Sequence, residues 1–269
     1  MSDHDHDQDD TLTFEHLSLI LEDDVALLTI EREATLNALD GELLLELASA
    51  FDLVEADARV RALVITGAGR AFVAGADLRA FAERRDGFAG RDAALSGQDV
   101  MNSLAALPLP TVAAINGYAL GGGLELALAC DLRVATRGAR LGLPEVTRGL
   151  IPGYGGTQRL QRLIGLGRAT DLVLTGRMVE AEEALALGLV NRVADDAVEA
   201  GLELARLCAR NAPVALGLAK EALTRGLDVT LPQGLEIEAD LFGLALTTDD
   251  AQEGIASFLE KRDPTFRGS

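Results

Sequence analysis

Cysteine is scarce in this chain of 269 residues, which contains only Cys130 and Cys208. Neither residue belongs to a CxxC pair or to a spacing typical of metal ligands. A disulfide framework and a cysteine-based metal site are therefore excluded. Both residues lie in segments with helical periodicity, and we expect them to be buried, reduced thiols, which fit a reducing compartment.

Basic residues are also few. The chain has 24 Lys and Arg against 43 Asp and Glu, which gives a formal net charge of −19. A protein that binds nucleic acid or an anionic membrane surface needs clustered Lys and Arg to neutralise phosphates. We therefore expect neither kind of partner, and any anionic ligand must be held by local groups.

Long apolar runs are absent too. No stretch reaches the roughly 18 apolar residues that a membrane-spanning helix requires. Residues 2–10 are acidic, unlike the cationic start of a secretory signal, so we expect a cytoplasmic protein. Residues 1–12 are expected to form a disordered acidic tail, in which His4 and His6 are too few for a metal site.

Three common catalytic motifs are missing as well. Gly67-Ala68-Gly69 is not followed by the further glycine of a complete GxGxxG, and the chain has no Gly-Lys-Ser/Thr phosphate loop. A GxSxG nucleophile elbow is also lacking. The glycines near residue 67 are therefore interpreted as a turn.

Short apolar runs predict strands at residues 17–21, 25–30, 62–66, 111–115 and 132–135. Glycine-rich loops at residues 67–77 and 116–121 follow two of these strands. Helical periodicity predicts helices at residues 122–130, 160–164, 169–174 and 181–187. Asp40 is the expected N-cap of another helix, whose apolar face carries Leu43, Leu44, Leu47, Phe51 and Val54. Beyond Gly153 the chain is expected to be almost entirely helical.

The order strand, loop, helix occurs twice, which favours an α/β fold of stacked ββα-like turns around a common core. We expect residues 13–196 to form this catalytic domain and residues 197–269 to form a helical domain. Residues 231–246 are apolar around most of the helix circumference, which is more than a small lobe can bury within itself. This pattern predicts a subunit interface in a homo-oligomer.

The segment with the clearest chemistry is NGYALGGGLELALAC at residues 116–130. Three glycines that lead into a helix leave backbone N–H groups unhindered, and such groups can hold an oxyanion. The loop that ends in Ala76 also follows an apolar strand, so it can present a second N–H at the same sheet edge. Glu125 lies in the first turn of the helix and Glu145 follows Pro144. Two carboxylates beside an oxyanion site suit the addition or removal of water next to a thioester.

Four motifs together resemble the enoyl-CoA hydratase/isomerase (crotonase) superfamily over roughly residues 14–266. They are AFVAGADL at residues 71–78, NGYALGGGLEL at residues 116–126, Pro144-Glu145, and IPGYGGTQRL at residues 151–160. Their order and spacing fit this superfamily throughout, so the combined pattern is highly specific.

The resemblance implies a crotonase-like spiral of ββα units and a C-terminal helical lobe for trimer contacts, often in a dimer of trimers. It implies that the N–H groups of Ala76 and Gly122 polarise the thioester carbonyl of an acyl-CoA. In the same way Glu125 would activate the water and Glu145 would protonate C2, with no metal or redox cofactor. The presence of both carboxylates favours a hydratase, a hydro-lyase that converts a trans-2-enoyl-CoA into a 3-hydroxyacyl-CoA in fatty-acid or related acyl-CoA degradation.

Two alternatives stay open. The chain could be an enoyl-CoA isomerase or a hydratase for a specialised acyl-CoA. It could also be a non-catalytic homologue that contacts RNA, which its acidic composition disfavours.

Further residues are expected to contact CoA or the acyl chain: Ala74, Asp77, Leu78, Arg79, Gly121, Gly153, Tyr154 and Lys261. Arg79 and Lys261 are the candidates for the CoA phosphates, Lys261 in reach across a subunit boundary. Tyr154 is expected in the wall of the acyl site, and residues 81–98 are expected to cover the acyl pocket.

Overall fold

The computed structural model describes residues 12–81 and 86–269. The predicted acidic tail, with His4 and His6, lies outside this range except for Leu12, which begins strand β1 (Leu12–Thr13). No helix within the described residues is long and apolar enough to cross a bilayer.

The larger sheet of the described chain has seven strands in the order β1-β2-β3-β4-β6-β8-β11. After β1 these are β2 (Leu17–Glu22), β3 (Val25–Ile30), β4 (Ala62–Gly67), β6 (Thr111–Ile115), β8 (Leu132–Thr136) and β11 (Arg192–Ala194). β1, β2 and β3 pair antiparallel, and every pairing from β3 to β11 is parallel. The strands predicted at residues 17–21 and 25–30 are therefore confirmed, and they pair as a hairpin.

A smaller sheet lies in the described chain with strand order β10-β9-β7-β5. Its strands are β5 (Ala71–Val73), β7 (Tyr118–Leu120), β9 (Arg140–Gly142) and β10 (Met178–Glu180). The prediction that residues 67–77 and 116–121 are loops throughout was wrong, because β5 and β7 lie inside them and pair in parallel. β10 and β11 also interrupt the helical region predicted beyond Gly153.

Each turn of the chain contributes one strand to each sheet, as β4 with β5, β6 with β7, and β8 with β9. Helices follow the first two of these pairs, which confirms the predicted ββα spiral. The pairing of β5 with β7 has a direct consequence for function. It places the residues that follow β5, which lead to Ala76, beside the start of helix α3 (Gly122–Ala129).

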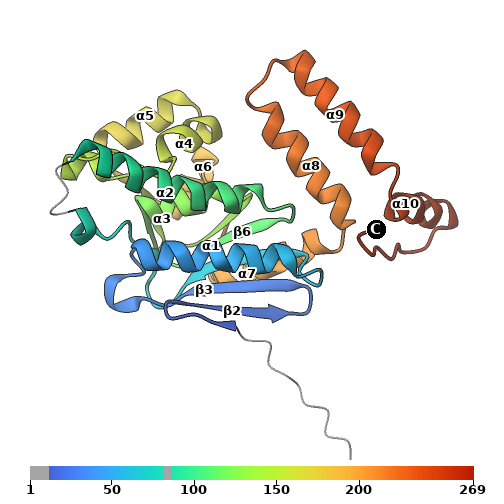
Figure 1. Cartoon of the computed structure of the whole chain (residues 1–269), viewed down its shortest axis with the longest axis horizontal. Coiled ribbons are helices and arrows are strands. Elements are labelled where there is room, and N and C mark those ends of the chain that lie inside the picture. Colours follow the sequence, from blue (N-terminus) through green and yellow to red (C-terminus); the bar gives the residue numbers. More distant parts are fainter. Residues whose placement is uncertain (1–11, 82–85) are drawn as a thin grey trace, which may run out of the picture.

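Helices pack on both faces of the larger sheet (Figure 1). α1 (Gly41–Ala56) starts at Asp40, whose side chain accepts from Leu43 N at 3.0 Å, and buries the five predicted apolar residues. α2 (Gly87–Ala106) packs against α1 and α3. The remaining helices of this region are α4 (Gly156–Ile164), α5 (Leu166–Thr175) and α6 (Ala181–Leu187).

Alternate residues of the central strands face opposite sides of the sheet. Leu63 and Ile65 of β4 belong to the main core, whereas Ala62 and Val64 pack with α7 (Ala197–Ala209) on the other face. Because other elements cover both faces of the sheet, both sets of side chains are buried. These strands therefore read as continuous apolar runs in the sequence. α7 is thus packed on the sheet of the spiral.

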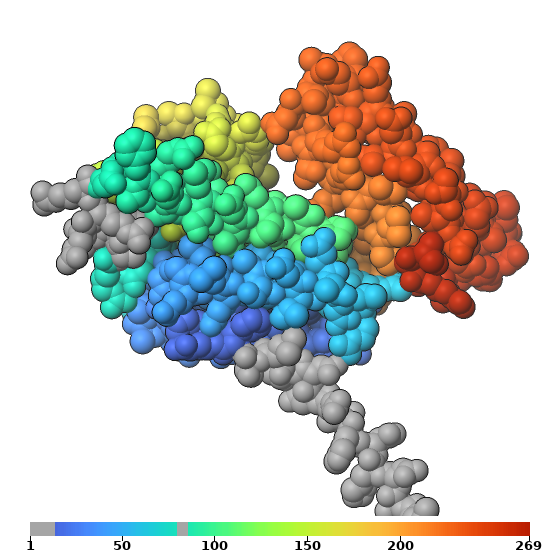
Figure 2. Space-filling view, viewed as in Figure 1, coloured from blue at the N-terminus to red at the C-terminus, as the bar shows by residue number. Residues whose placement is uncertain are grey.

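α8 (Pro213–Gly226), α9 (Leu231–Ala245) and α10 (Asp249–Glu260) form a lobe that projects from the spiral (Figures 1 and 2). Its large apolar side chains are mostly exposed. They include Leu223, Leu227, Leu231, Leu235, Phe242, Leu244, Phe258 and Leu259.

The two thiols are unpaired. Cys130 is buried at the C-cap of α3, and its burial raises the pKa of the thiol to about 12. Cys208 lies half-buried in α7, where burial also raises its pKa. The prediction of a buried thiol is confirmed for Cys130, whereas Cys208 is only partly buried.

Helix α2 is seated on the buried ring of Tyr154. A Cβ atom on Gly97 would lie 2.1 Å from Cδ1 of that ring, so only glycine fits at this position of the helix. The predicted cover at residues 81–98 is therefore mostly helix, since α2 begins at Gly87. Residues 82–85 of that prediction lie outside the described range.

We predict that Gly97→Ala destabilises the protein. Alanine gains about 0.5–1 kcal/mol of helix propensity over glycine, but overpacking a buried ring costs about 1–3 kcal/mol. Gly90 is the matched control, because it lies in the same helix and a Cβ there would meet nothing within 4 Å. Gly90→Ala should raise the free energy of unfolding in urea and Gly97→Ala should lower it. A stabilised Gly97→Ala protein would show that the Tyr154 ring has room to move.

Candidate active site

Within the described residues, the backbone N–H of Ala76 has no partner, because the hydrogen bonds that hold its loop use the groups on either side of it. The segment that follows η1 (Glu33–Thr35) runs beside the loop, and Leu39 forms an isolated parallel bridge with Ala76. Leu39 N donates to Gly75 O at 2.9 Å, and Asp77 N donates to Leu39 O at 2.7 Å. Among the described residues, nothing accepts from Ala76 N itself.

The N–H of Gly122 is the second free donor. Gly122 is the first residue of α3, and the opening N–H groups of a helix have no partner within the helix. A Cβ atom on Gly122 would lie 3.5 Å from Ala76 N, which shows how closely the two backbones approach. The two N–H groups therefore belong to closely packed backbone segments.

Close backbone packing creates this arrangement. A Cβ on Gly123 would lie 1.9 Å from the carbonyl oxygen of Val73, so no other residue fits there without displacing β5. Gly121 has a φ of +52°, a conformation that favours glycine, and it turns the chain from β7 into α3. The three consecutive glycines thus have separate roles: Gly121 makes the turn, Gly122 offers an N–H donor, and Gly123 allows close contact with β5.

Glu125 is almost completely buried, with an exposed fraction of 2%. Its Oε1 accepts from Tyr154 N and from Gly156 N, both at 2.7 Å. Gly156 is the first residue of α4, so the carboxylate lies at the positive end of that helix. Burial raises the pKa of Glu125, while the two backbone hydrogen bonds and the charge of Arg159 oppose that rise.

Glu145 begins η3 (Glu145–Arg148) directly after Pro144. Its Oε2 is buried and has no hydrogen-bond partner within the described chain. Its Oε1 would lie 3.1 Å from a Cβ on Gly121, so this carboxyl borders the glycine turn. Burial, and secondarily the charge of Glu125, raises the pKa of Glu145 to about 7.

The two carboxyl groups therefore differ in their surroundings. Glu125 has two N–H donors and a nearby cation, which stabilise the charged form. Glu145 has a buried oxygen without a donor, which stabilises the protonated form. Burial raises the pKa of both groups, and at Glu125 donors from two other residues and a cation oppose that rise, so the two carboxyl groups are suited to different roles as base and acid.

The other predicted contact residues differ in how close they lie to this centre. Gly121 and Tyr154 lie next to the two carboxyl groups. Ala74 precedes Ala76 in the same loop, and its N–H donates to Leu36 O. Gly153 precedes Tyr154, and its carbonyl accepts from Gln98 of α2 at 2.8 Å. These residues come from three separate parts of the sequence.

Asp77, Leu78 and Arg79 continue outward from Ala76. Asp77 and Arg79 form an ion pair at 2.6 Å, which lowers the pKa of Asp77 to about 2 through the hydrogen bonds from Arg79. Leu78 is half-exposed and the Arg79 side chain is 76% exposed. Lys261 is the C-cap of α10, which lies in the projecting lobe, on the far side of the molecule from α3 (Figure 1). Within one chain, Lys261 does not join the site.

Sequence reasoning missed the groups that hold these functional residues. The N–H groups of Tyr154 and Gly156 bind Glu125, and the Gly155-Gly156 pair before an amphipathic helix was the available signal for an anion-binding helix start. Asn37 was also missed. It is fully buried, and its Nδ2 donates to the carbonyls of Ala71 and Phe72 at 2.8 and 3.2 Å.

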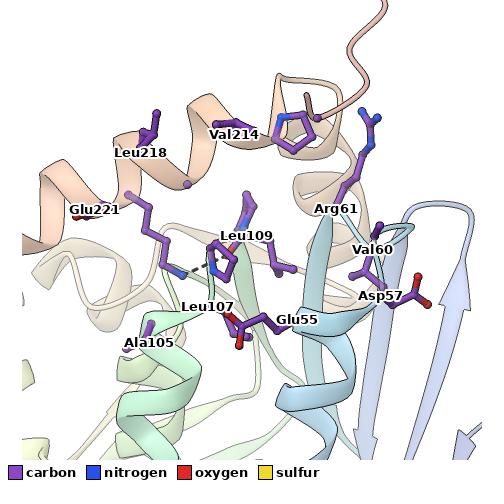
Figure 3. A pocket seen from close by; sticks show the side chains of 18 of the residues that line it. Glu55, Asp57, Val60, Arg61, Ala105, Leu107, Leu109, Val214, Leu218 and Glu221 are labelled. Carbon is purple, nitrogen blue, oxygen red and sulfur yellow. Dashed lines mark hydrogen bonds between the residues drawn. The ribbon is translucent and has the colours of Figure 1, made fainter. Parts of the chain in front are cut away.

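A cavity of about 700 Å³ lies elsewhere, between the spiral and α8. Figure 3 shows Leu107 and Leu109 facing Val214 and Leu218 across it, with Glu55 and Arg61 at its margin. None of the predicted site residues lines this cavity, so it is separate from the two carboxylates. In the described part of the chain, no group of three or more His, Cys, Asp or Glu is arranged to hold a metal ion.

Comparison with known protein families shows which family this chain belongs to. The family profile described as Enoyl-CoA hydratase/isomerase matches residues 21–269. The chain belongs to this family. The match includes both oxyanion loops and both carboxylates.

Individual relatives within the enoyl-CoA hydratase/isomerase family agree. The chain is 42% identical to a short-chain-enoyl-CoA hydratase of Clostridium acetobutylicum, over 88% of this chain and 92% of the relative. It is 44% identical to a 2,3-dehydroadipyl-CoA hydratase of Escherichia coli, over 91% and 95% of the two chains. A solved enoyl-CoA hydratase from Bacillus anthracis superimposes with a TM-score of 0.91 at 42% identity, covering 95% of this chain and all of that one. The crotonase-like fold is thereby confirmed.

We predict that Glu145 titrates near pH 7 in the free protein. The signal is the carboxyl carbon resonance of Glu145 in protein labelled with ¹³C at glutamate Cδ, assigned by its loss in Glu145→Gln. In Glu125→Gln the neighbouring negative charge is gone, so the pKa of Glu145 should fall while burial still keeps it above the ordinary value. Titration of Glu145 at an ordinary glutamate pKa would contradict the burial seen here.

Proposed function

We propose that this protein is an enoyl-CoA hydratase, a hydro-lyase that adds water reversibly to a trans-2-enoyl-CoA and forms a 3-hydroxyacyl-CoA. The observation that carries the proposal is the pair of carboxyl groups, one buried and one half-buried, with different hydrogen-bond partners beside one proposed two-donor oxyanion site. An isomerase that moves a double bond needs one group to relay a proton. Hydration needs a base for water and an acid for carbon at once, and Glu125 and Glu145 supply both.

The proposed reaction starts with the thioester. Its carbonyl oxygen accepts from the N–H groups of Ala76 and Gly122, which draws electron density from C3. Glu125 takes a proton from a water molecule as the water oxygen bonds to C3, and the resulting enolate is stabilised by the same two N–H groups. Protonated Glu145 then gives its proton to C2, so one water has been added and the oxyanion returns to a carbonyl. Proton exchange with solvent removes the proton from Glu125 and restores the one on Glu145. In dehydration the two carboxyl groups exchange roles.

The proposed steps use only groups of the chain itself, with neither a metal nor a redox cofactor. Ala74, Gly121 and Gly153 would contact the substrate through the backbone around the oxyanion site. The Tyr154 ring supports a role in the acyl wall, because Cδ2 would lie 3.4 Å from a Cβ on Gly122.

The proposed CoA contacts lie farther out. Asp77 and Leu78 lead from the oxyanion loop to Arg79, whose exposed guanidinium would meet a CoA phosphate. Lys261 would reach a CoA phosphate only from a neighbouring subunit, because α10 projects away from the site of its own chain (Figure 1).

We further propose a homotrimer or a dimer of trimers, with α8 to α10 as the associating lobe. The exposed apolar side chains of these helices support this, since a patch of that kind marks a protein contact in a folded chain. The predicted domain boundary at residue 197 stays a prediction, and α7 packs on the sheet of the spiral. The unpaired thiols of Cys130 and Cys208 support a cytoplasmic location, and a role in acyl-CoA degradation follows from the proposed substrate.

The first test is the loss of enoyl-thioester absorbance when the protein meets crotonyl-CoA, with the product identified by mass. We expect a rapid loss and the addition of one water. A product with a shifted double bond and no added water would instead identify an isomerase. No change with any enoyl-CoA from four to about ten carbons would overturn the proposal.

Glu125→Gln and Glu145→Gln should each lower kcat for hydration by a factor of about 100 to 10,000, since each removes a proton-transfer group and keeps the shape of the side chain. KM should change far less. Glu182→Gln, an exposed site on α6, is the matched control and should keep full activity. Near-normal kcat in either active-site variant would rule out the two-carboxylate mechanism.

Light scattering should give a mass of three or six times the 28.3 kDa of one chain. Leu235 and Phe242 lie two turns apart on α9 and are 54% and 64% exposed. The double change Leu235→Glu and Phe242→Glu should yield smaller species, whereas Glu238→Gln on the same helix should not. A wild-type monomer at micromolar concentration would contradict this prediction.

A further inference from the structure

Arg159 occupies a place where a cation is locally unfavourable. It lies in the first half of α4, close to the positive end of the helix dipole. Its side chain is half-buried, and this burial lowers the pKa of the guanidinium. A residue that is disfavoured by its own helix and by burial needs a compensating interaction from outside that helix.

The guanidinium donates two hydrogen bonds to acceptors in different parts of the chain. Nη1 donates to Tyr154 O at 3.2 Å, and Nη2 donates to Asn102 Oδ1 of α2 at 2.7 Å. Gly155 leaves room for this reach. Its φ is +108°, and a Cβ there would lie 2.3 Å from Nη1 of Arg159.

Tyr154 links Arg159 to the base of the proposed reaction. Its carbonyl accepts from Arg159, and its own N–H donates to Oε1 of Glu125. Arg159 therefore holds the residue that holds Glu125. The positive charge of Arg159 also attracts the buried carboxylate directly.

We propose that Arg159 is a positioning residue for hydration, which keeps Glu125 ready as the base by orienting Tyr154 and by placing a positive charge beside the carboxylate. This inference rests on the proposed function. It adds a residue that contacts neither the substrate nor the reacting atoms.

The charges around Glu125 determine the expected direction of change. Arg159 approaches from α4 and Glu145 from η3, and the N-terminal N–H groups of α4 complete the environment. Burial of Glu125 raises its pKa and Arg159 lowers it. Removal of the cation leaves burial less opposed, so the pKa of Glu125 should rise. Because the base works only when deprotonated, the acidic fall in kcat/KM should move to higher pH.

The test compares Arg159→Met and Arg159→Gln, which lack the charge, with Arg159→Lys, which keeps it. Hydration of crotonyl-CoA is followed from about pH 5 to about pH 9. We expect the acidic limb of kcat/KM to rise by about one pH unit in both neutral variants, which is a tenfold loss of activity on that limb, and kcat to fall more than KM changes. Arg159→Lys should restore the wild-type limb. Asn102→Ala removes one hydrogen bond of the guanidinium and leaves the charge, so its limb should also stay in place.

A second measurement separates this inference from the proposed function. The Glu125 carboxyl titration is recorded by ¹³C NMR in the free protein, with the resonance assigned by Glu125→Gln. It should move upward in Arg159→Met and Arg159→Gln whatever reaction the enzyme catalyses. Absence of hydration by wild-type protein would overturn the proposed function alone. An unchanged Glu125 titration in a folded neutral variant would overturn the role of Arg159, and Arg159→Gln serves this purpose if Arg159→Met fails to fold.

Discussion

The site depends on direct backbone contact between successive turns of the spiral. Gly123 meets the carbonyl of Val73 and Gly117 meets the carbonyl of Arg70, where Cβ atoms would lie 1.9 and 2.1 Å from oxygen. With side chains at these positions the turns would move apart, and the N–H groups of Ala76 and Gly122 would no longer face one oxygen. Because an oxyanion hole works through fixed dipoles at hydrogen-bond distance, this spacing determines whether the site can function.

The loop that carries Ala76 is fixed from its other side by residues 36–39. Asn37 adopts a left-handed conformation with φ of +60° and binds the carbonyls that precede the loop with its side-chain amide. The backbone groups on both sides of Ala76 N are engaged with Leu39. The loop is therefore held on both sides of Ala76, while among the described residues the N–H of Ala76 itself has no acceptor.

Electrostatics then separate the roles of two chemically identical side chains. Glu125 lies at the start of α4 with two N–H donors and Arg159 nearby, whereas Glu145 is half-buried and its Oε2 has no donor among the described residues. The same fold thus raises the pKa of both carboxyl groups and opposes that rise at Glu125 with donors and a cation from other residues. Outside the spiral, the lobe of α8 to α10 exposes apolar side chains that the spiral does not cover. The proposed assembly connects the two regions, because only another subunit could bring Lys261 to a bound CoA.

Sequence alone determined those features that depend on local pattern. The strands at residues 17–21 and 25–30, the cap at Asp40 and the buried face of α1 all follow from residue type and spacing within a few positions, whereas the proposed roles of Glu125 and Glu145 follow from the resemblance of four separate motifs. The tertiary structure decided the features that need distant partners. Strands of three residues such as β5 and β7 have too little pattern to be predicted and exist because they pair with each other. The contacts of Glu125 with Tyr154 and Gly156, and of Arg159 with Asn102, join residues far apart in the chain. These residues are buried and form hydrogen bonds with one another only in the folded spiral. The pKa values of the two carboxyl groups therefore depend on the tertiary structure and cannot be predicted from the motifs alone.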